Sequence, residues 1–287
     1  MDAWEIARGL LPAGMADAAK AYPSAEEIRL RVGKAPCLVI AGREIAFWET
    51  AVSRTDLLRV LEKATGASLH AAAPALRAGY VAYRGLRIGV CGEAVYSSGA
   101  LSGMRSFSSL AIRIPHVCPA DYSGFIEKLL HPQPASTLIA APPGVGKTTF
   151  LRELIRRAAE AGARVAVIDE RNELSACVGG EAQFDLGRAS DVLVGVAKKD
   201  AAMMLLRGMN PQIIAMDEIT REEDTQAVEQ IAGCGVQIFA TVHGKSLEEM
   251  KKRPLYRALL AHGIFQELVT IRCLGARRIC EREALCV

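Results

Sequence analysis

An apolar run, a glycine-rich turn and an amphipathic helix follow one another between Thr137 and Ala158, and this order constrains the fold more than any other feature of the sequence. Residues 137–140 read T-L-I-A and residues 141–149 read A-P-P-G-V-G-K-T-T. Apolar side chains then recur at helical spacing up to Ala158. A strand that runs into such a turn and continues as a helix is the context that a P-loop requires. The segment therefore predicts an α/β domain with a phosphate-binding turn.

The turn has the residue types needed to hold a nucleotide and Mg²⁺. Glycines at 144 and 146 let the backbone bend and point its N–H groups inward, and the helix N-terminus adds to this anion site. Lys147 is predicted to reach the β- and γ-phosphates of ATP, and Thr148 to offer its hydroxyl to Mg²⁺. Ala141 stands where the motif usually begins with glycine, and a small residue suffices there. The predicted nucleotide-binding residues are Pro143, Gly144, Val145, Gly146, Lys147, Thr148, Thr149 and His243.

Composition excludes several classes of protein. Hydrophobic residues make up 51% and charged residues 23% of 287 residues, which predicts a folded chain of about two domains. A net charge of +3 is too small to indicate nucleic-acid binding by itself. No apolar run approaches the roughly 18 residues of a membrane span, and the start of the chain is acidic rather than a secretory leader. We therefore expect a cytoplasmic protein, attached to a membrane at most through a partner, with its eight cysteines reduced.

The two halves of the chain differ in pattern. Residues 1–115 mix helical stretches with short alternating strands and predict a small α+β domain. Prolines punctuate residues 116–135, which we interpret as a linker. Residues 136–287 alternate strand and helix, which predicts a mostly parallel sheet with helices on both faces.

Acidic residues follow two of the predicted parallel strands, at the edge where such sheets bind ligands. Asp217 closes the apolar run 213–216 and is predicted to hold Mg²⁺ opposite Thr148. Glu218 is predicted to act as the general base on the attacking water, with Glu170 as the alternative base. The segment Asp169-Glu170-Arg171 is expected either to contact the water, the metal shell or the ribose, or to be a solvated strand exit.

Other polar residues are candidates for sensing and for charge stabilisation. His243 ends an apolar strand and is predicted to sense the γ-phosphate, a role that the hydroxyl of Thr241 can share. Phosphoryl transfer also needs further positive charge. The candidate arginines are Arg105, Arg113, Arg171 and Arg221, each with domain positioning as the alternative role. The basic tail, with Arg272, Arg277, Arg278 and Arg282, is expected to be a solvated hairpin or a subunit contact.

Four segments in this order, P-P-G-V-G-K-T-T, V-I-D-E-R-N-E-L, I-I-A-M-D-E-I and F-A-T-V-H-G, resemble the stage III sporulation AA proteins, a branch of the secretion-type ATPases. Residues 27–34, 89–94 and 108–114 agree with the same family. The resemblance implies a RecA-like ATPase core behind a small N-terminal domain, and a ring, expected to be a hexamer, with ATP between subunits. It also implies docking on membrane proteins of the channel between mother cell and forespore.

The family motifs assign roles to two further sites. The resemblance implies that Asp169 and Glu170 correspond to the acidic box of the secretion ATPases, and His243 to their histidine box, which is reduced here to one histidine. The leading hypothesis is therefore an ATP-hydrolysing motor or assembly ATPase. The alternatives are a RecA-like nucleic-acid-dependent ATPase, for which we expect no room after the last strands, and an ATP-gated scaffold that does not hydrolyse.

Overall fold

A computed structural model of the protein describes residues 3–66, 73–97, 99–114, 122–274 and 277–285. The chain forms two compact units, Met1–Val117 and Cys118–Val287, and each is described by itself. Residues 116–121 of the expected linker lie outside the described residues, and residues 123–130 form a helix of the second unit. The division into 1–115, 116–135 and 136–287 stays a prediction.

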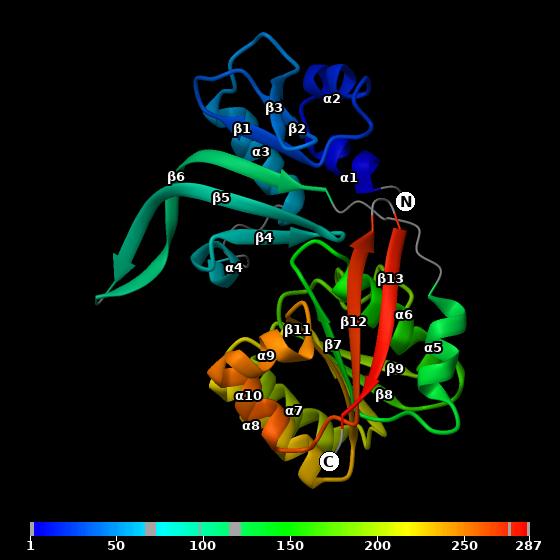
Figure 1. Ribbon diagram of the computed structural model, residues 1–287. Helices are drawn as coiled ribbons and strands as arrows, with labels where there is room; N and C mark the ends of the chain where they lie inside the picture. Colours follow the sequence, from blue (N-terminus) through cyan, green and yellow to red (C-terminus); the bar gives the residue numbers. More distant parts are fainter. Residues whose placement is uncertain (1–2, 67–72, 98, 115–121, 275–276, 286–287) are drawn as a thin grey trace. The chain divides into compact units, whose positions relative to one another are not determined.

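The N-terminal unit is built on an antiparallel six-stranded sheet in the order β3-β2-β1-β6-β5-β4 (Figure 1). Its elements are α1 (Ala3–Leu10), α2 (Ala13–Ala19), β1 (Glu27–Arg31), β2 (Cys37–Ile40), β3 (Arg43–Ala46), α3 (Arg54–Ala64), α4 (Ala73–Arg77), β4 (Tyr80–Tyr83), β5 (Leu86–Ser97) and β6 (Ala100–Arg113). In β1, Ile28 and Leu30 are fully buried, while Arg29 and Arg31 are only partly covered. Because of this alternation, one face of the sheet packs against α1 and α3 and forms a hydrophobic core with them.

The C-terminal unit is built on a seven-stranded sheet in the order β13-β12-β7-β11-β10-β8-β9. All its strands pair in parallel except the outer hairpin β12–β13. Its elements are α5 (Ser123–Leu130), β7 (Thr137–Ala141), α6 (Lys147–Glu160), β8 (Val165–Asp169), β9 (Ser190–Val194), α7 (Lys198–Gly208), β10 (Ile213–Met216), α8 (Glu222–Gly233), β11 (Gln237–His243), α9 (Leu247–Lys252), α10 (Pro254–Ala261), β12 (Glu267–Leu274) and β13 (Arg277–Ala284).

Helices cover both faces of this sheet, because its central strands are apolar on both sides. All residues of β7, β8 and β10 are buried, as expected for parallel strands. One face packs against α5 and α6, and the other against α7, α8, α9 and α10. The predicted α/β sheet with helices on both faces is confirmed. Within the described residues, no helix has the length and apolar character to cross a membrane.

The strand order brings the sequence motifs to one edge. Strand β11 lies between β7, which leads into the glycine-rich turn, and β10, which leads into Asp217. Strand β8 follows on the other side of β10. Because these four strands are parallel, their carboxyl ends lie at the same edge of the sheet. His243, at the end of β11, therefore lies between the glycine-rich turn and the acidic pair Asp217 and Glu218.

Candidate functional site

The glycine-rich turn connects β7 to α6 and leaves the start of α6 open to an anion. Gly144 and Gly146 have φ angles of +75° and +105°, which residues with a Cβ rarely adopt. Gly146 is the N-cap of α6, and among the described residues no side chain caps this helix. The first N–H groups of a helix need acceptors from outside it. An anionic group such as a phosphate can meet this need, and Lys147, Thr148 and Thr149 lie in the first turn.

The Lys147 side chain crosses from the turn to the neighbouring strand. It is buried, with 7% of its surface exposed. Its Nζ donates to the carbonyl oxygen of Pro142 at 3.3 Å and to Nδ1 of His243 at 3.0 Å. Burial lowers the pKa of Lys147, while the carboxylates of Asp217 and Glu218 act to raise it. The ammonium is thus a poorly hydrated cation beside the anion site.

His243 links Lys147 to Glu218. An ammonium group can only donate, so Nδ1 of His243 accepts from Lys147 and its Nε2 carries the hydrogen. Nε2 lies 2.5 Å from Oε1 of Glu218. The other oxygen of Glu218 accepts from Nη1 of Arg171 at 2.7 Å. Four side chains from four strand ends therefore form one hydrogen-bonded row.

The Asp217 carboxylate accepts hydrogen bonds from two hydroxyl groups, one on α6 and one on β11. Thr148 Oγ1 donates to Oδ2 at 3.0 Å, and Thr241 Oγ1 donates to Oδ1. The Thr148 hydroxyl and the Asp217 carboxylate are hard oxygen donors beside a phosphate cradle, which is the donor set that Mg²⁺ takes in nucleotide sites. The residues therefore fit the predicted metal site.

Glu218 has an unusual backbone. Its φ of +47° lies in the left-handed region, which costs energy for a residue with a side chain. The Glu218 N–H donates to Oγ1 of the fully buried Thr241 at 2.8 Å, which holds this conformation. Thr241 thus fixes the backbone of Glu218 and the carboxylate of Asp217 together.

The two acidic residues at the end of β8, Asp169 and Glu170, contact different parts of the structure. Asp169 is buried, and its carboxylate accepts the backbone N–H groups of Glu173, Leu174 and Ser175 and the Ser175 hydroxyl at 2.7–3.1 Å. It anchors the following loop. Glu170 points elsewhere and binds Nζ of Lys198 at 2.9 Å. Lys198 also lies 3.6 Å from the carboxylate of Asp224 on α8.

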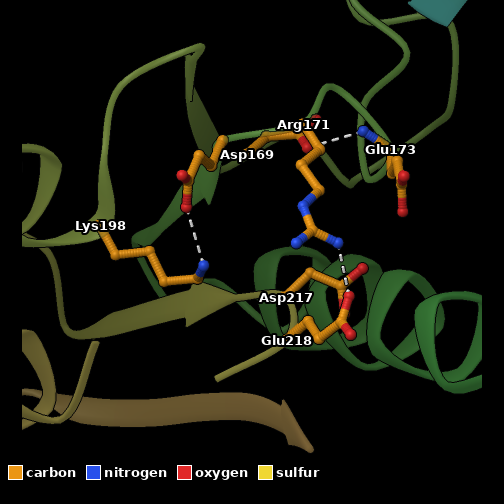
Figure 2. Close-up of a pocket in the computed structure, with 7 residues that line it drawn as sticks. Asp169, Arg171, Glu173, Lys198, Asp217 and Glu218 are labelled. Carbon is orange, nitrogen blue, oxygen red and sulfur yellow. Dashed lines mark hydrogen bonds and ion pairs between the residues drawn. The ribbon is translucent and has the colours of Figure 1, made fainter. Parts of the chain in front are cut away.

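Both candidate bases, Glu170 and Glu218, line one cavity. Figure 2 labels Glu218 in this cavity, together with Arg171 and Lys198. This small cavity is partly open to solvent, and its walls include Glu170 with Lys198 and Glu218 with Arg171. Asp217 lies next to Glu218 on the same wall. Lys198 carried no sequence signal, because its role depends on α7 packing beside the end of β8.

The candidate arginines separate into two groups. Arg171 contacts Glu218, and Arg221 is exposed at the start of α8. Arg105 and Arg113 belong to the N-terminal unit, where their side chains are 73% and 69% exposed beside Glu93 and Glu27. They are therefore accessible to a second molecule.

One arginine of the basic tail lies at the turn. A Cβ placed on Gly146 would be 3.0 Å from Nη1 of Arg278 and 3.1 Å from its Cζ. The sequence indicated only a solvated hairpin or a subunit contact there. The contact with Gly146 depends on pairing between strands far apart in the chain, and no local pattern reveals it.

Several known proteins resemble this chain in sequence or in fold. Stage III sporulation protein AA of Bacillus subtilis (strain 168) is 30% identical over 278 residues, which cover 93% of this chain and 90% of that protein. The crystal structure of the pilus retraction motor PilT with bound ADP superposes with a TM-score of 0.64 at 20% identity, covering 99% of this chain and 83% of that one. The ATPase DotB of Legionella pneumophila gives a TM-score of 0.60 at 17% identity, covering 95% and 80%.

At these identities the two solved structures establish the fold. The predicted fold, a mostly parallel α/β core that follows a small α+β domain in the sequence, is confirmed by the likeness to PilT, and the sheet of the N-terminal domain is antiparallel. The model of the family described as sporulation stage III, protein AA, matches residues 8–277. Together with the Bacillus relative, this match over nearly the whole chain means that the protein belongs to the sporulation stage III protein AA family.

Proposed function

We propose that the protein binds ATP with Mg²⁺ and hydrolyses it as a subunit of a secretion-type ring. The observation that carries this proposal is the row Lys147–His243–Glu218, which joins the glycine-rich turn to the acidic end of β10. A binding site alone does not require a carboxylate there. A hydrolytic site does, because the attacking water must lose a proton.

In this proposal each residue of the site has a role in the reaction. The N–H groups of the turn and the Lys147 ammonium bind the phosphate chain, with residues 143–149 as the cradle. Thr148 and Asp217 would hold Mg²⁺, which neutralises charge on the phosphates when it is bound. Glu218 accepts the proton of the attacking water, and the oxygens of the γ-phosphate compete with His243 for Lys147. Through its contacts with Lys147 and Glu218, His243 thereby couples binding of the γ-phosphate to the position of the Glu218 carboxylate.

Glu170 has a different role in this proposal from Glu218. Its ion pair with Lys198 ties it to α7 and, through Lys198, to Asp224 of α8. We assign it to positioning the cavity wall rather than to proton transfer. Both carboxylates nevertheless line the same cavity, so the assay below includes both.

The test is phosphate release with Mg²⁺-ATP. Lys147→Ala is expected to lose nucleotide binding, and Glu218→Gln to bind ATP but hydrolyse it about 10²–10⁴-fold more slowly than wild type. Glu170→Gln is expected to retain more turnover than Glu218→Gln. The matched control is Glu229→Gln, the same change at an exposed position of α8, which leaves turnover unchanged.

Each alternative has its own result in this assay. ATP binding by wild type with turnover no higher than that of Glu218→Gln would contradict hydrolysis and favour the ATP-gated scaffold. Stimulation by single-stranded DNA or RNA that weakens with added salt would favour the nucleic-acid-dependent ATPase.

We further propose that the ring works during sporulation on membrane proteins of the channel between mother cell and forespore, from the cytoplasmic side and as a hexamer. The family description and the Bacillus relative support the sporulation setting.

A further inference from the structure

Arg278 packs against the glycine-rich turn from the C-terminal hairpin. A Cβ on Gly146 would meet three atoms of its guanidinium, Nη1 at 3.0 Å, Cζ at 3.1 Å and Nε at 3.5 Å. The guanidinium therefore lies directly over the last glycine of the turn, one residue before Lys147. Its Nε atom is shielded from solvent.

The hairpin holds Arg278 in this place through the sheet. Strand β12 pairs in parallel with β7, and β13 pairs antiparallel with β12. In this register Cys280 lies opposite Ile271, and both pack against the core that contains α6. Burial raises the pKa of the Cys280 thiol to about 11, which reflects its place in that core. Arg278 is two residues from Cys280 and so points to the same face, toward the start of α6.

The position suits a ligand with several negative charges. The turn already collects backbone N–H groups and one ammonium for the phosphate chain. A guanidinium adds a planar fork of donors that matches phosphate oxygens two at a time. Lys147 approaches the cradle from inside the sheet, whereas Arg278 approaches it from the hairpin.

We propose that Arg278 binds the phosphate chain of the nucleotide in the same chain as Lys147, so that the hairpin β12–β13 is part of the nucleotide site. This inference rests on the nucleotide binding proposed above. It differs from an arginine finger, because Arg278 acts within one subunit and on ADP as well as ATP. It also gives the C-terminal hairpin a direct contact with the nucleotide.

The test is calorimetric titration of the full-length protein with Mg²⁺-ADP, inorganic pyrophosphate and adenosine. Arg278→Ala is expected to weaken both ADP and pyrophosphate about tenfold or more, as expected for the loss of a charged hydrogen-bond donor. Arg278→Lys is expected to fall between wild type and alanine, because it keeps the charge and loses the fork. Arg278→Gln keeps a long side chain against Gly146 without charge, so it separates the effect of charge from that of packing.

Arg272→Ala is the matched control. Arg272 is on the same hairpin, lies opposite Ile279 on the other face and pairs with Glu281, so its loss is expected to leave ADP binding unchanged. Thermal melting of every variant confirms that it is folded.

The outcomes separate this inference from the proposed function. If wild type binds neither ADP nor pyrophosphate, the proposed function fails and the inference fails with it. If wild type binds both and Arg278→Gln binds them equally well, the inference alone is overturned. A loss that is as large for adenosine as for ADP, with pyrophosphate unaffected, also overturns it, because the contact is then with the nucleoside. A loss for ADP and pyrophosphate that follows the order Arg, Lys, Gln supports it.

Discussion

Thr241 has more influence on the site than its small hydroxyl suggests. It is fully buried at the end of β11, donates to Asp217 and accepts from the backbone N–H of Glu218. The hydroxyl therefore forms hydrogen bonds with two consecutive residues that follow β10. Because Glu218 has a positive φ, its backbone depends on this acceptor.

Replacing Thr241 by valine keeps the shape of the side chain and removes both hydrogen bonds. We expect Thr241→Val to lower the free energy of unfolding by about 1–3 kcal/mol, because the Glu218 N–H and a carboxylate oxygen of Asp217 lose their partner. ATP turnover is expected to fall with it. Urea unfolding and phosphate release measure the two effects. Thr241→Ser keeps the hydroxyl and serves as control; equal stability of the valine and serine variants would refute this account.

The loop between β8 and β9 is an ordered element, although it contains little regular structure. Asp169 anchors its beginning with four hydrogen bonds. Its end is fixed by Gly187, where a Cβ would lie 2.7 Å from the Arg156 carbonyl oxygen and 2.8 Å from the Cβ of Ala159. Both of these neighbours belong to α6. The loop thus connects the acidic end of β8 to the helix that begins at the phosphate cradle.

Two glycines of this loop allow a matched comparison. Gly180 and Gly187 have φ angles of +88° and +86°, but a Cβ on Gly180 would meet nothing within 4 Å. We expect Gly180→Ala to cost about 1–2 kcal/mol of stability, from backbone conformation alone. Gly187→Ala is expected to cost about 1–3 kcal/mol more, because the methyl group overlaps α6. Chemical denaturation of both variants measures the difference; equal costs would mean that the loop end does not pack on α6.

At the scale of the whole molecule, the proposed ring predicts that one subunit completes the site of the next. The N-terminal unit carries Arg105 and Arg113 with exposed side chains, whereas Glu218 is inside the C-terminal unit. A head-to-tail ring presents the same surface of each subunit to its neighbour. An arginine that acts across this interface leaves its own subunit's site intact.

Mixing two inactive variants tests this arrangement. Arg105→Ala and Arg113→Ala are each tested for loss of the arginine that acts on the neighbouring subunit. The variant that lacks this arginine is expected to bind ATP without hydrolysing it. Mixed in equal amounts with Glu218→Gln, it should recover about a quarter of wild-type turnover, because that share of interfaces pairs an intact Glu218 with an intact arginine. Lys147→Ala mixed with Glu218→Gln is the control and stays inactive, since both defects are in the same site. If neither arginine variant complements Glu218→Gln, no trans role exists for either residue.

The local sequence determined the parts of this protein. The glycine-rich turn, the apolar strands and the acidic residues that end β8 and β10 are set by short-range patterns of polarity and backbone freedom, and they predicted both the α/β core and the candidates Lys147, Thr148, Asp217 and Glu218. The helices and parallel strands then appeared largely where these patterns indicated.

Only the tertiary structure decided which of these parts meet. Strand β11 lies between β7 and β10, so His243 bridges Lys147 and Glu218. Lys198 of α7 pairs with Glu170, and Arg278 of β13 contacts Gly146. These contacts depend on strand order and on packing of apolar faces that are separated by many residues. A local pattern specifies that a strand is buried, but the pairing of distant strands specifies which side chains share its end.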